Sequence, residues 1–266
     1  MLVDYVKRFQ LPLFFILCLV ISWSIWIPEA LTTLSNSEEP IAGGGLLDML
    51  AVWGPALSAI LISLMITGKK GVRALFHPIH RWRVGIHWYI LVLFYPAAVR
   101  LVARAIDIIL GQSYEFPFMP LLTYFGPNYT FMVIIALVFA LPNTLGEELG
   151  WRGFALPKLQ EKYNALVSSI ILGIFWGLWH IPLWIAFGQT AVPLLINVIG
   201  IVGTAILFTW VFNSTKESLL LVWIFHFAMT VTGYLLSPIP TLTDEIISWI
   251  IIVIIIYITG RHLSQK

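Results

Sequence analysis

Charged residues are scarce in this chain of 266 residues: Asp, Glu, Lys and Arg make up 11%, while 59% of the residues are hydrophobic. A soluble domain carries roughly a quarter charged residues and about half apolar ones. So much apolar surface cannot be hidden in one water-soluble core of this size, and lipid is the solvent that suits it. The formal net charge is only +2, so the total charge gives no sign of a nucleic-acid partner.

Cysteine and the common hydrolase motifs are also missing. Cys18 is the only cysteine and lies in an apolar run, which excludes disulfides within the chain, a cysteine nucleophile and a cysteine-based metal site. The chain contains no H-E-x-x-H motif and no G-x-S-x-G motif. The zinc-protease helix and the serine nucleophile elbow are therefore excluded as well.

Long hydrophobic runs dominate instead. Eight segments are long enough, or nearly so, to cross a hydrocarbon core of roughly 30 Å, which takes ~20 helical residues. Backbone groups in lipid must be paired internally, and these runs do not alternate strictly as barrel strands do. We therefore predict an all-α fold, a polytopic membrane helical bundle that forms a single domain over 1–266. The spans are expected near 11–33, 46–66, 87–110, 129–158, 164–187, 191–213, 218–236 and 244–259.

The basic residues outside these spans all fall on one side of the eight-span topology. They lie at 7–8, 69–83, 158–162, 216 and 261–266, whereas the opposite connections contain no Lys or Arg. Positive charge accumulates in cytoplasmic connections, so the pattern predicts that both termini are cytoplasmic. We expect a multi-pass protein of a bacterial cytoplasmic membrane.

Ionisable side chains inside a span cost several kcal/mol, so each one is a functional candidate. Counted from the cytoplasmic ends of their spans at 1.5 Å per residue, Glu147, His226 and His180 lie ~16, ~13 and ~24 Å deep. Helix tilt and kinks absorb such differences. We expect the three side chains to meet in one layer that opens toward the cytoplasm.

The spacing within the fourth span separates the two acids. Glu148 and Arg152 are four residues apart, with the acid first, as a helical ion pair prefers. Glu147 is rotated by ~100° from Glu148, so it can face water while its neighbour pairs with Arg152. A carboxylate in that position suits a general base.

Hydrolysis is the chemistry that these residue types support, although the spacing alone favours it only slightly over transport. The imidazoles can donate hydrogen bonds to an oxyanion, or Glu147, His180 and His226 can hold a divalent metal such as zinc. A metal-dependent and a metal-free mechanism both stay open. The alternative is a transport or proton-relay path, which is disfavoured because Gln189 is the only polar residue between His180 and the outer connection.

Three further ionisable residues, all in the third span, have a structural interpretation. Arg100, Arg104 and Asp107 are spaced so that they can form one ion-pair cluster near the outer face.

Three sequence elements, in order, resemble one protease family. GEELGWRGFALPKLQ (Gly146–Gln160) resembles the E-E-x-x-x-R signature of the CAAX protease and bacteriocin-processing family, also called the ABI or type II CAAX prenyl endopeptidase family. WGLWH (Trp176–His180) and HFAMT (His226–Thr230) resemble its two histidine elements, and WGPALSAIL (Trp53–Leu61) resembles its bacterial members upstream.

The resemblance implies an eight-helix intramembrane endopeptidase with its protease core at about 129–236. Glu147 then corresponds to the acid that activates water, and Glu148 and Arg152 to its structural companions. His180 and His226 correspond to the histidines that orient water and stabilise the oxyanion or bind a metal.

Thr230 stands where the family has Asn or Asp, and it can donate one hydrogen bond but has no amide. That departure is the best argument for a third function, a non-catalytic protein of the bacteriocin-immunity type. As partners we expect a peptide or protein substrate near the inner leaflet and the membrane lipid, and no nucleic acid.

Overall fold

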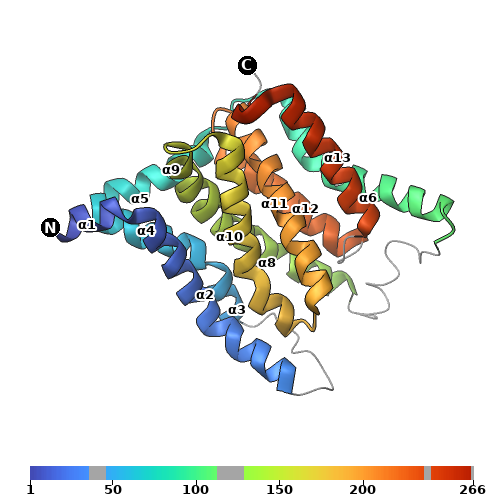
Figure 1. Ribbon diagram of the computed structural model, residues 1–266, viewed down its shortest axis with the longest axis horizontal. Helices are drawn as coiled ribbons and strands as arrows, with labels where there is room; N and C mark the ends of the chain where they lie inside the picture. The colour runs from blue at the N-terminus through green and yellow to red at the C-terminus, as the bar shows by residue number, and fades with distance from the viewer. Residues whose placement is uncertain (36–45, 113–128, 237–240, 265–266) are drawn as a thin grey trace.

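The computed structural model describes residues 1–35, 46–112, 129–236 and 241–264 (Figure 1). The regular structure of these residues is entirely helical. The helices are α1 (Leu2–Arg8), α2 (Gln10–Ser35), α3 (Leu46–Val52), α4 (Gly54–Thr67), α5 (Lys69–Phe76), the 3₁₀-helix η1 (His77–His80), α6 (Ile86–Ile109), α8 (Tyr129–Gly150), the π-helix η3 (Trp151–Ala155), α9 (Leu156–Gln160), α10 (Ala165–Ala186), α11 (Ala191–Ser214), α12 (Leu219–Leu236), α13 (Leu242–Thr259) and the 3₁₀-helix η4 (Gly260–His262). Most of the predicted connections at 34–45, 111–128 and 237–243 lie outside the described residues.

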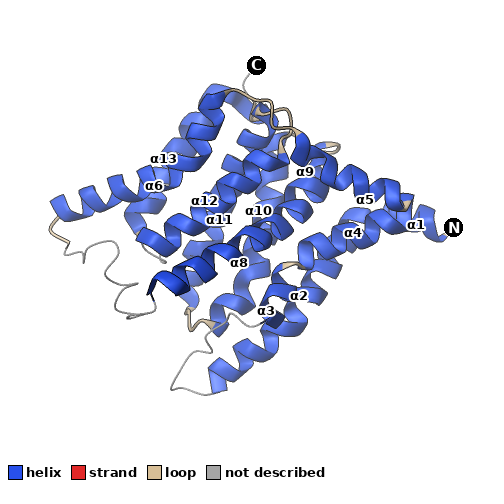
Figure 2. Ribbon diagram, turned by 180° about the vertical axis from the view of Figure 1, so that it is seen from behind, coloured by secondary structure: helices blue, strands red, loops and turns tan. Residues whose placement is uncertain are grey.

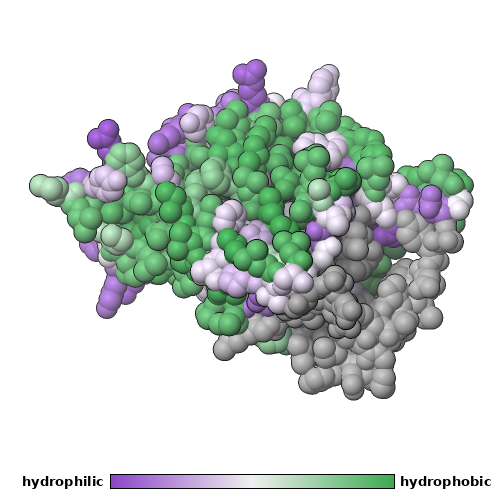
Figure 3. Space-filling model, turned by 60° about the horizontal axis from the view of Figure 1, so that its bottom comes forward, coloured by the Kyte–Doolittle hydropathy of each residue, from purple (hydrophilic) through white to green (hydrophobic). Residues whose placement is uncertain are grey.

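Six helices are long and apolar enough to cross a membrane within the part of the chain that the structure describes. They are α2, α6, α10, α11, α12 and the segment Leu242–His262. Apolar side chains cover much of the outside of the molecule: Tyr257 is 90% exposed, and Figure 3 shows a broad hydrophobic face. The predicted polytopic helical bundle is confirmed, whereas the count of eight spans and the cytoplasmic termini stay predictions.

The second and fourth predicted spans are irregular, and proline accounts for much of this. The second is broken at Trp53 into α3 and α4, with Pro55 in the first turn of α4. The fourth contains Pro142 inside α8 and continues through the π-helix η3 into α9. Proline has no amide hydrogen to donate along the helix. Beside Pro142 the hydroxyl of Thr144 donates to the Ala140 carbonyl at 2.8 Å, and Trp223 of α12 donates to the Leu141 carbonyl at 3.0 Å.

The connections that carry basic residues lie together at one end of the bundle, near α9 and the C-terminus (Figure 1). Arg81 donates to the Lys216 carbonyl at 2.9 Å, and Asn213 donates to Gln160 at 3.1 Å and to the His262 carbonyl at 3.2 Å. These bonds join four connections that the sequence assigned to the same side of the membrane.

An ion-pair cluster joins α6 to α13. Arg104 lies 3.7 Å from Asp107 on its own helix, and Arg100 and Arg104 lie 3.5 and 3.8 Å from Asp244 of α13. The hydroxyl of Thr243 donates to Asp107. The three residues predicted to form a cluster do so, and α13 adds Asp244 to them.

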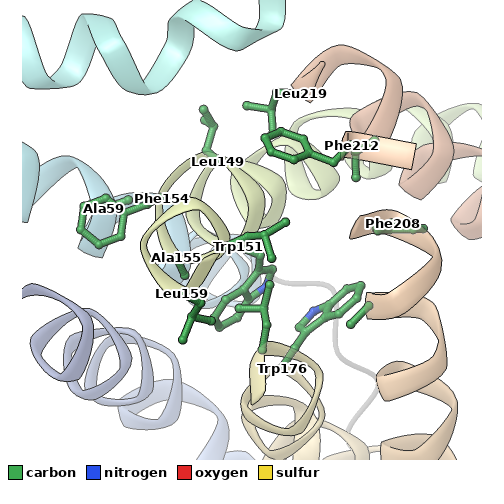
Figure 4. Packing of buried hydrophobic residues seen from close by; sticks show 14 of the residues in the cluster. Ala59, Leu149, Trp151, Phe154, Ala155, Leu159, Trp176, Phe208, Phe212 and Leu219 are labelled. Atoms are coloured by element: carbon green, nitrogen blue, oxygen red, sulfur yellow. The ribbon is translucent and has the colours of Figure 1, made fainter. Parts of the chain in front are cut away.

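Helix α8 lies between two groups of helices, with α3 and α4 on one side and α12 on the other (Figures 1 and 2). Its end and η3 pack into the apolar core cluster of the described residues, which includes Trp151, Trp176 and Phe208 (Figure 4). Glycines permit the close contact with α4. A Cβ atom on Gly150 would lie 2.7 Å from the carbonyl oxygen of Pro55.

We therefore expect Gly150→Ala to destabilise the protein by about 1–3 kcal/mol, the usual cost of overpacking a filled contact. The matched control is Gly233→Ala in α12, where, apart from the backbone of its own helix and its chain neighbours, no described residue has an atom within 4 Å of the added methyl group. That variant should unfold at the same temperature as the parent protein or slightly above it, because alanine favours a helix over glycine. Thermal unfolding in detergent measures both, and equal unfolding temperatures for the two variants would contradict the expectation.

Candidate active site

Two adjacent acids of α8 lie in the interior of the bundle. The side chains of Glu147 and Glu148 are 7% and 0% exposed. An oxygen of Glu147, Oε2, accepts a hydrogen bond of 2.7 Å from the indole nitrogen of Trp176 on α10. This bond holds the carboxylate in place, and it makes Trp176 a residue of the site. The sequence indicated Trp176 only as the residue one helical turn before His180.

Glu148 is the centre of a charged network. Its Oε1 lies 3.0 Å from Arg152 Nη1 and 2.8 Å from Nδ1 of His226 on α12. The predicted Glu148–Arg152 pair is confirmed. The depths along the helices predicted that His226 lies in one layer with Glu147 and His180, and the structure adds that its ring contacts Glu148.

Arg152 is fully buried, and aromatic rings complete its surroundings. Its guanidinium carbon lies 4.4 Å from the ring centroid of Trp176 and 4.7 Å from that of Phe208. Arg152 belongs to the π-helix η3, and such turns are frequent at functional sites because they redirect side chains. Cation–π contact stabilises a desolvated guanidinium that has few hydrogen-bond partners.

His180 lies beside Trp176, one turn further along α10. Its Nδ1 lies 2.9 Å from the Trp176 carbonyl oxygen, and its ring stacks on Trp184 at 5.0 Å. A carbonyl oxygen only accepts, so Nδ1 carries the proton and Nε2 is the free acceptor of the neutral ring. The ring centroids of His180 and His226 lie 6.1 and 5.4 Å from that of Trp176. One indole therefore contacts Glu147 and both histidines.

The hydroxyl of Thr230 forms its hydrogen bond within α12 and not with the side chains of Glu147, His180 or His226. Its Oγ1 donates to the His226 carbonyl at 3.1 Å, a bond within α12. The residue that replaces the family's Asn or Asp is thus engaged by its own helix.

Asn143 is a polar residue that the sequence analysis missed. It lies one turn before Glu147 in α8, directly after Pro142, and so on the same helix face. Its Oδ1 is buried and has no hydrogen-bond partner among the described residues. A buried amide without a partner is costly, which makes Asn143 a candidate contact for a bound molecule. An amide at this spacing inside an apolar span was the available signal.

One feature of the two histidines is typical of metal sites. Metal-binding histidines usually donate their second ring N–H to a carboxylate or carbonyl, as the Nδ1 atoms of His226 and His180 are placed to do. However, no three His, Cys, Asp or Glu side chains gather as one ligand set in the described parts of the chain. No step below therefore passes through a metal, and the predicted set of Glu147, His180 and His226 stays a prediction.

Comparison with known proteins agrees with the resemblance of the motifs. Residues 128–232 match the family described as type II CAAX prenyl endopeptidase Rce1-like. A CAAX prenyl protease 2 of Methanococcus maripaludis is 33% identical over 135 residues, which cover 48% of this chain and 44% of that protein. The chain thus aligns with less than half the length of this relative. The Rce1-like segment, residues 128–232, contains Glu147, Glu148, Arg152, His180, His226 and Thr230.

The buried pair predicts different outcomes for the two adjacent acids. Glu148→Ala leaves the guanidinium of Arg152 buried without its carboxylate, which typically costs about 3–5 kcal/mol. Glu147→Gln keeps an oxygen that accepts from Trp176 and should unfold within a few degrees of the parent protein. Thermal unfolding and the yield of folded protein in detergent measure the difference, and a Glu148→Ala variant as stable as Glu147→Gln would refute the structural role of Glu148.

Proposed function

We propose that this protein is an intramembrane endopeptidase that hydrolyses peptide bonds of membrane-associated peptides or proteins. The observation that carries the proposal is the buried Glu147 carboxylate, held by Trp176 beside the Glu148–Arg152–His226 network. The match of residues 128–232 to a protease family supports it.

Glu147 is the general base of this mechanism. One carboxylate oxygen accepts from Trp176, and the other is available to a water molecule. The carboxylate takes a proton as the water oxygen attacks the carbonyl carbon of the peptide bond. The same proton then passes to the leaving amine nitrogen when the carbon–nitrogen bond breaks.

The histidines orient the water and stabilise the charge that develops on the carbonyl oxygen. His226 is held in place through Nδ1 by Glu148 at 2.8 Å. His180 offers Nε2 as an acceptor while neutral, so it positions water and donates to an oxyanion only after protonation. A divalent metal such as zinc at Glu147, His180 and His226 is the alternative proposal for the same residues.

Asn143 supplies the side-chain amide that is missing at position 230. Its amide lies one helical turn from Glu147 on the same face, within reach of a peptide group bound to that carboxylate. The carbonyl oxygen accepts from a substrate N–H, and the amide nitrogen donates to a substrate oxygen. The absence of any partner for Oδ1 within the described residues supports this role.

The substrate that we propose is a peptide or protein segment close to the inner leaflet, in a bacterial cytoplasmic membrane, with surrounding lipid as the other partner and no nucleic acid. The relative from Methanococcus is described as a prenyl protease, so prenylated peptides are the first substrates to test.

A second candidate function, proton or ion transfer, has one observation in its favour. A cavity of about 300 Å³ lies between α6, α10, α11, α12 and α13, and its lining includes Arg100, Gln189, Asn197 and Glu245. Along its own helix, His180 is followed on the outer side only by the polar residue Gln189, which is all that the spacing within one helix can reveal. Neighbouring helices contribute the other three.

The test of the protease function uses purified protein in proteoliposomes with prenylated and unprenylated fluorogenic peptides. Glu147→Gln should lower kcat by at least about 100-fold, since removal of a general base typically costs 10²–10⁴-fold. Helicity and yield should be unchanged. The control is Glu161→Gln in the exposed turn after α9, which should cleave as the parent protein does. Equal cleavage by Glu147→Gln and the parent protein would remove the protease function. Proton flux without cleavage would favour the second candidate.

The role of Asn143 is tested by loss and rescue. Asn143→Ala should lower kcat by roughly 10–100-fold, the size expected for the loss of one or two hydrogen bonds to a reacting group. Adding Thr230→Asn to that variant restores an amide near His226 and should recover part of the rate. A rate for Asn143→Ala that matches the parent protein, or a double variant no faster than Asn143→Ala, would show that Asn143 does not contact the substrate.

A further inference from the structure

A basic cleft lies at the end of the bundle where the charged connections meet. Its volume is about 820 Å³. One wall is the segment between η1 and α6, and the other is the turn between α11 and α12. Its lining includes Arg81, Trp82, Arg83, Lys216 and Glu217.

The cleft carries excess positive charge. Arg81 Nη1 lies 2.6 Å from Glu217 Oε2, so these two residues neutralise each other. Arg83 and Lys216 have no carboxylate within ion-pair distance among the described residues, and both side chains are exposed. Arg83 and Lys216, on opposite walls of the cleft, are therefore available to bind an anion.

The wall that carries Lys216 has a strained backbone. Lys216 and Glu217 have φ angles of 57° and 58°, in the left-handed region that non-glycine residues avoid. The Arg81 guanidinium donates to the carbonyl oxygens of Lys216 and Glu217 at 2.9 and 3.4 Å. Strain of this kind persists only where the surroundings hold it, and it often marks a functional segment. Arg81 thus fixes the turn that presents Lys216 to the cleft.

Exposed apolar side chains beside these cations indicate a membrane interface. Trp82 and Ile86 are 56% and 72% exposed, and the Arg83 guanidinium lies 5.1 Å from the Trp82 ring centroid. Helix α6 begins at Ile86 and has no side-chain cap at Gly85, so the positive end of its dipole adds partial positive charge nearby. Tryptophan beside arginine is typical of the level of the lipid headgroups.

We propose that this cleft binds the phosphate group of an anionic lipid headgroup of the leaflet at that end of the bundle. Arg83 offers a planar fork for two phosphate oxygens, and Lys216 adds a point charge from the opposite wall. Trp82 and Ile86 lie beside the acyl chains of the same lipid. The site is separate from the Glu147 network and does not depend on the protease function.

The experiment titrates the full-length detergent-purified protein with three probes: short-chain phosphatidylglycerol, short-chain phosphatidylcholine and inorganic phosphate. Binding is measured by native mass spectrometry and by the shift in unfolding temperature. The parent protein should prefer phosphatidylglycerol. The double variant Arg83→Gln/Lys216→Gln should bind it roughly 30-fold more weakly, because each basic residue near anionic lipid contributes about fivefold. The control Lys69→Gln/Lys70→Gln removes the same charge from exposed positions in the same connection and should bind as the parent protein does.

Three outcomes would overturn the proposal. Equal weakening in both double variants means that general positive charge, not the cleft, attracts the lipid. Saturation by inorganic phosphate at the affinity of phosphatidylglycerol means a free-phosphate site. Equal binding of the two lipids means that the anionic headgroup is not recognised.

Discussion

Arg152 is a fully buried guanidinium in a protein surrounded by lipid, and the bundle around the site is organised to tolerate it. Its charge is balanced by Glu148 at 3.0 Å, and its faces are covered by Trp176 and Phe208. These partners come from α8, α10 and α11, so α8 and η3 cannot move away from α10 and α11 without exposing an unpaired charge to hydrocarbon, at a cost of several kcal/mol. Glu148 also binds His226, which brings α12 into the same arrangement.

Irregular backbone is concentrated in the helix that carries the acids. Pro142 interrupts the hydrogen bonding of α8 one turn before Glu147, and the π-helix η3 follows one turn after it. Beside the proline, Thr144 and Trp223 donate hydrogen bonds to the carbonyl groups of Ala140 and Leu141. Irregular backbone at membrane depth is tolerated only where protein or a water-filled cavity surrounds it. The distortions therefore coincide with the interior site.

The basic cleft and the acid network use charge in opposite ways. In the interior, Glu148, Arg152 and His226 are linked at distances of 2.8–3.0 Å, so the positive charge of the guanidinium is balanced. At the end of the bundle, Arg83 and Lys216 are exposed and have no carboxylate within ion-pair distance among the described residues, and water and counterions make such an unpaired surface charge inexpensive. Only the basic cleft therefore has excess positive charge that attracts an anionic ligand.

The sequence by itself determined the membrane class, the helical segments, the Glu148–Arg152 pair and the cluster of Arg100, Arg104 and Asp107, because hydrophobic run length and spacing along one helix are local properties. Only the tertiary structure decided that Trp176 binds Glu147, that His226 binds Glu148 and that Asp244 joins the cluster, because these contacts join separate helices. The breaks at Trp53 and in η3 were also beyond the sequence. Pro55 and Pro142 mark the two irregular spans in the sequence, but proline alone does not predict where a helix breaks or becomes a π-helix, because neighbouring helices add contacts such as that between Gly150 and Pro55.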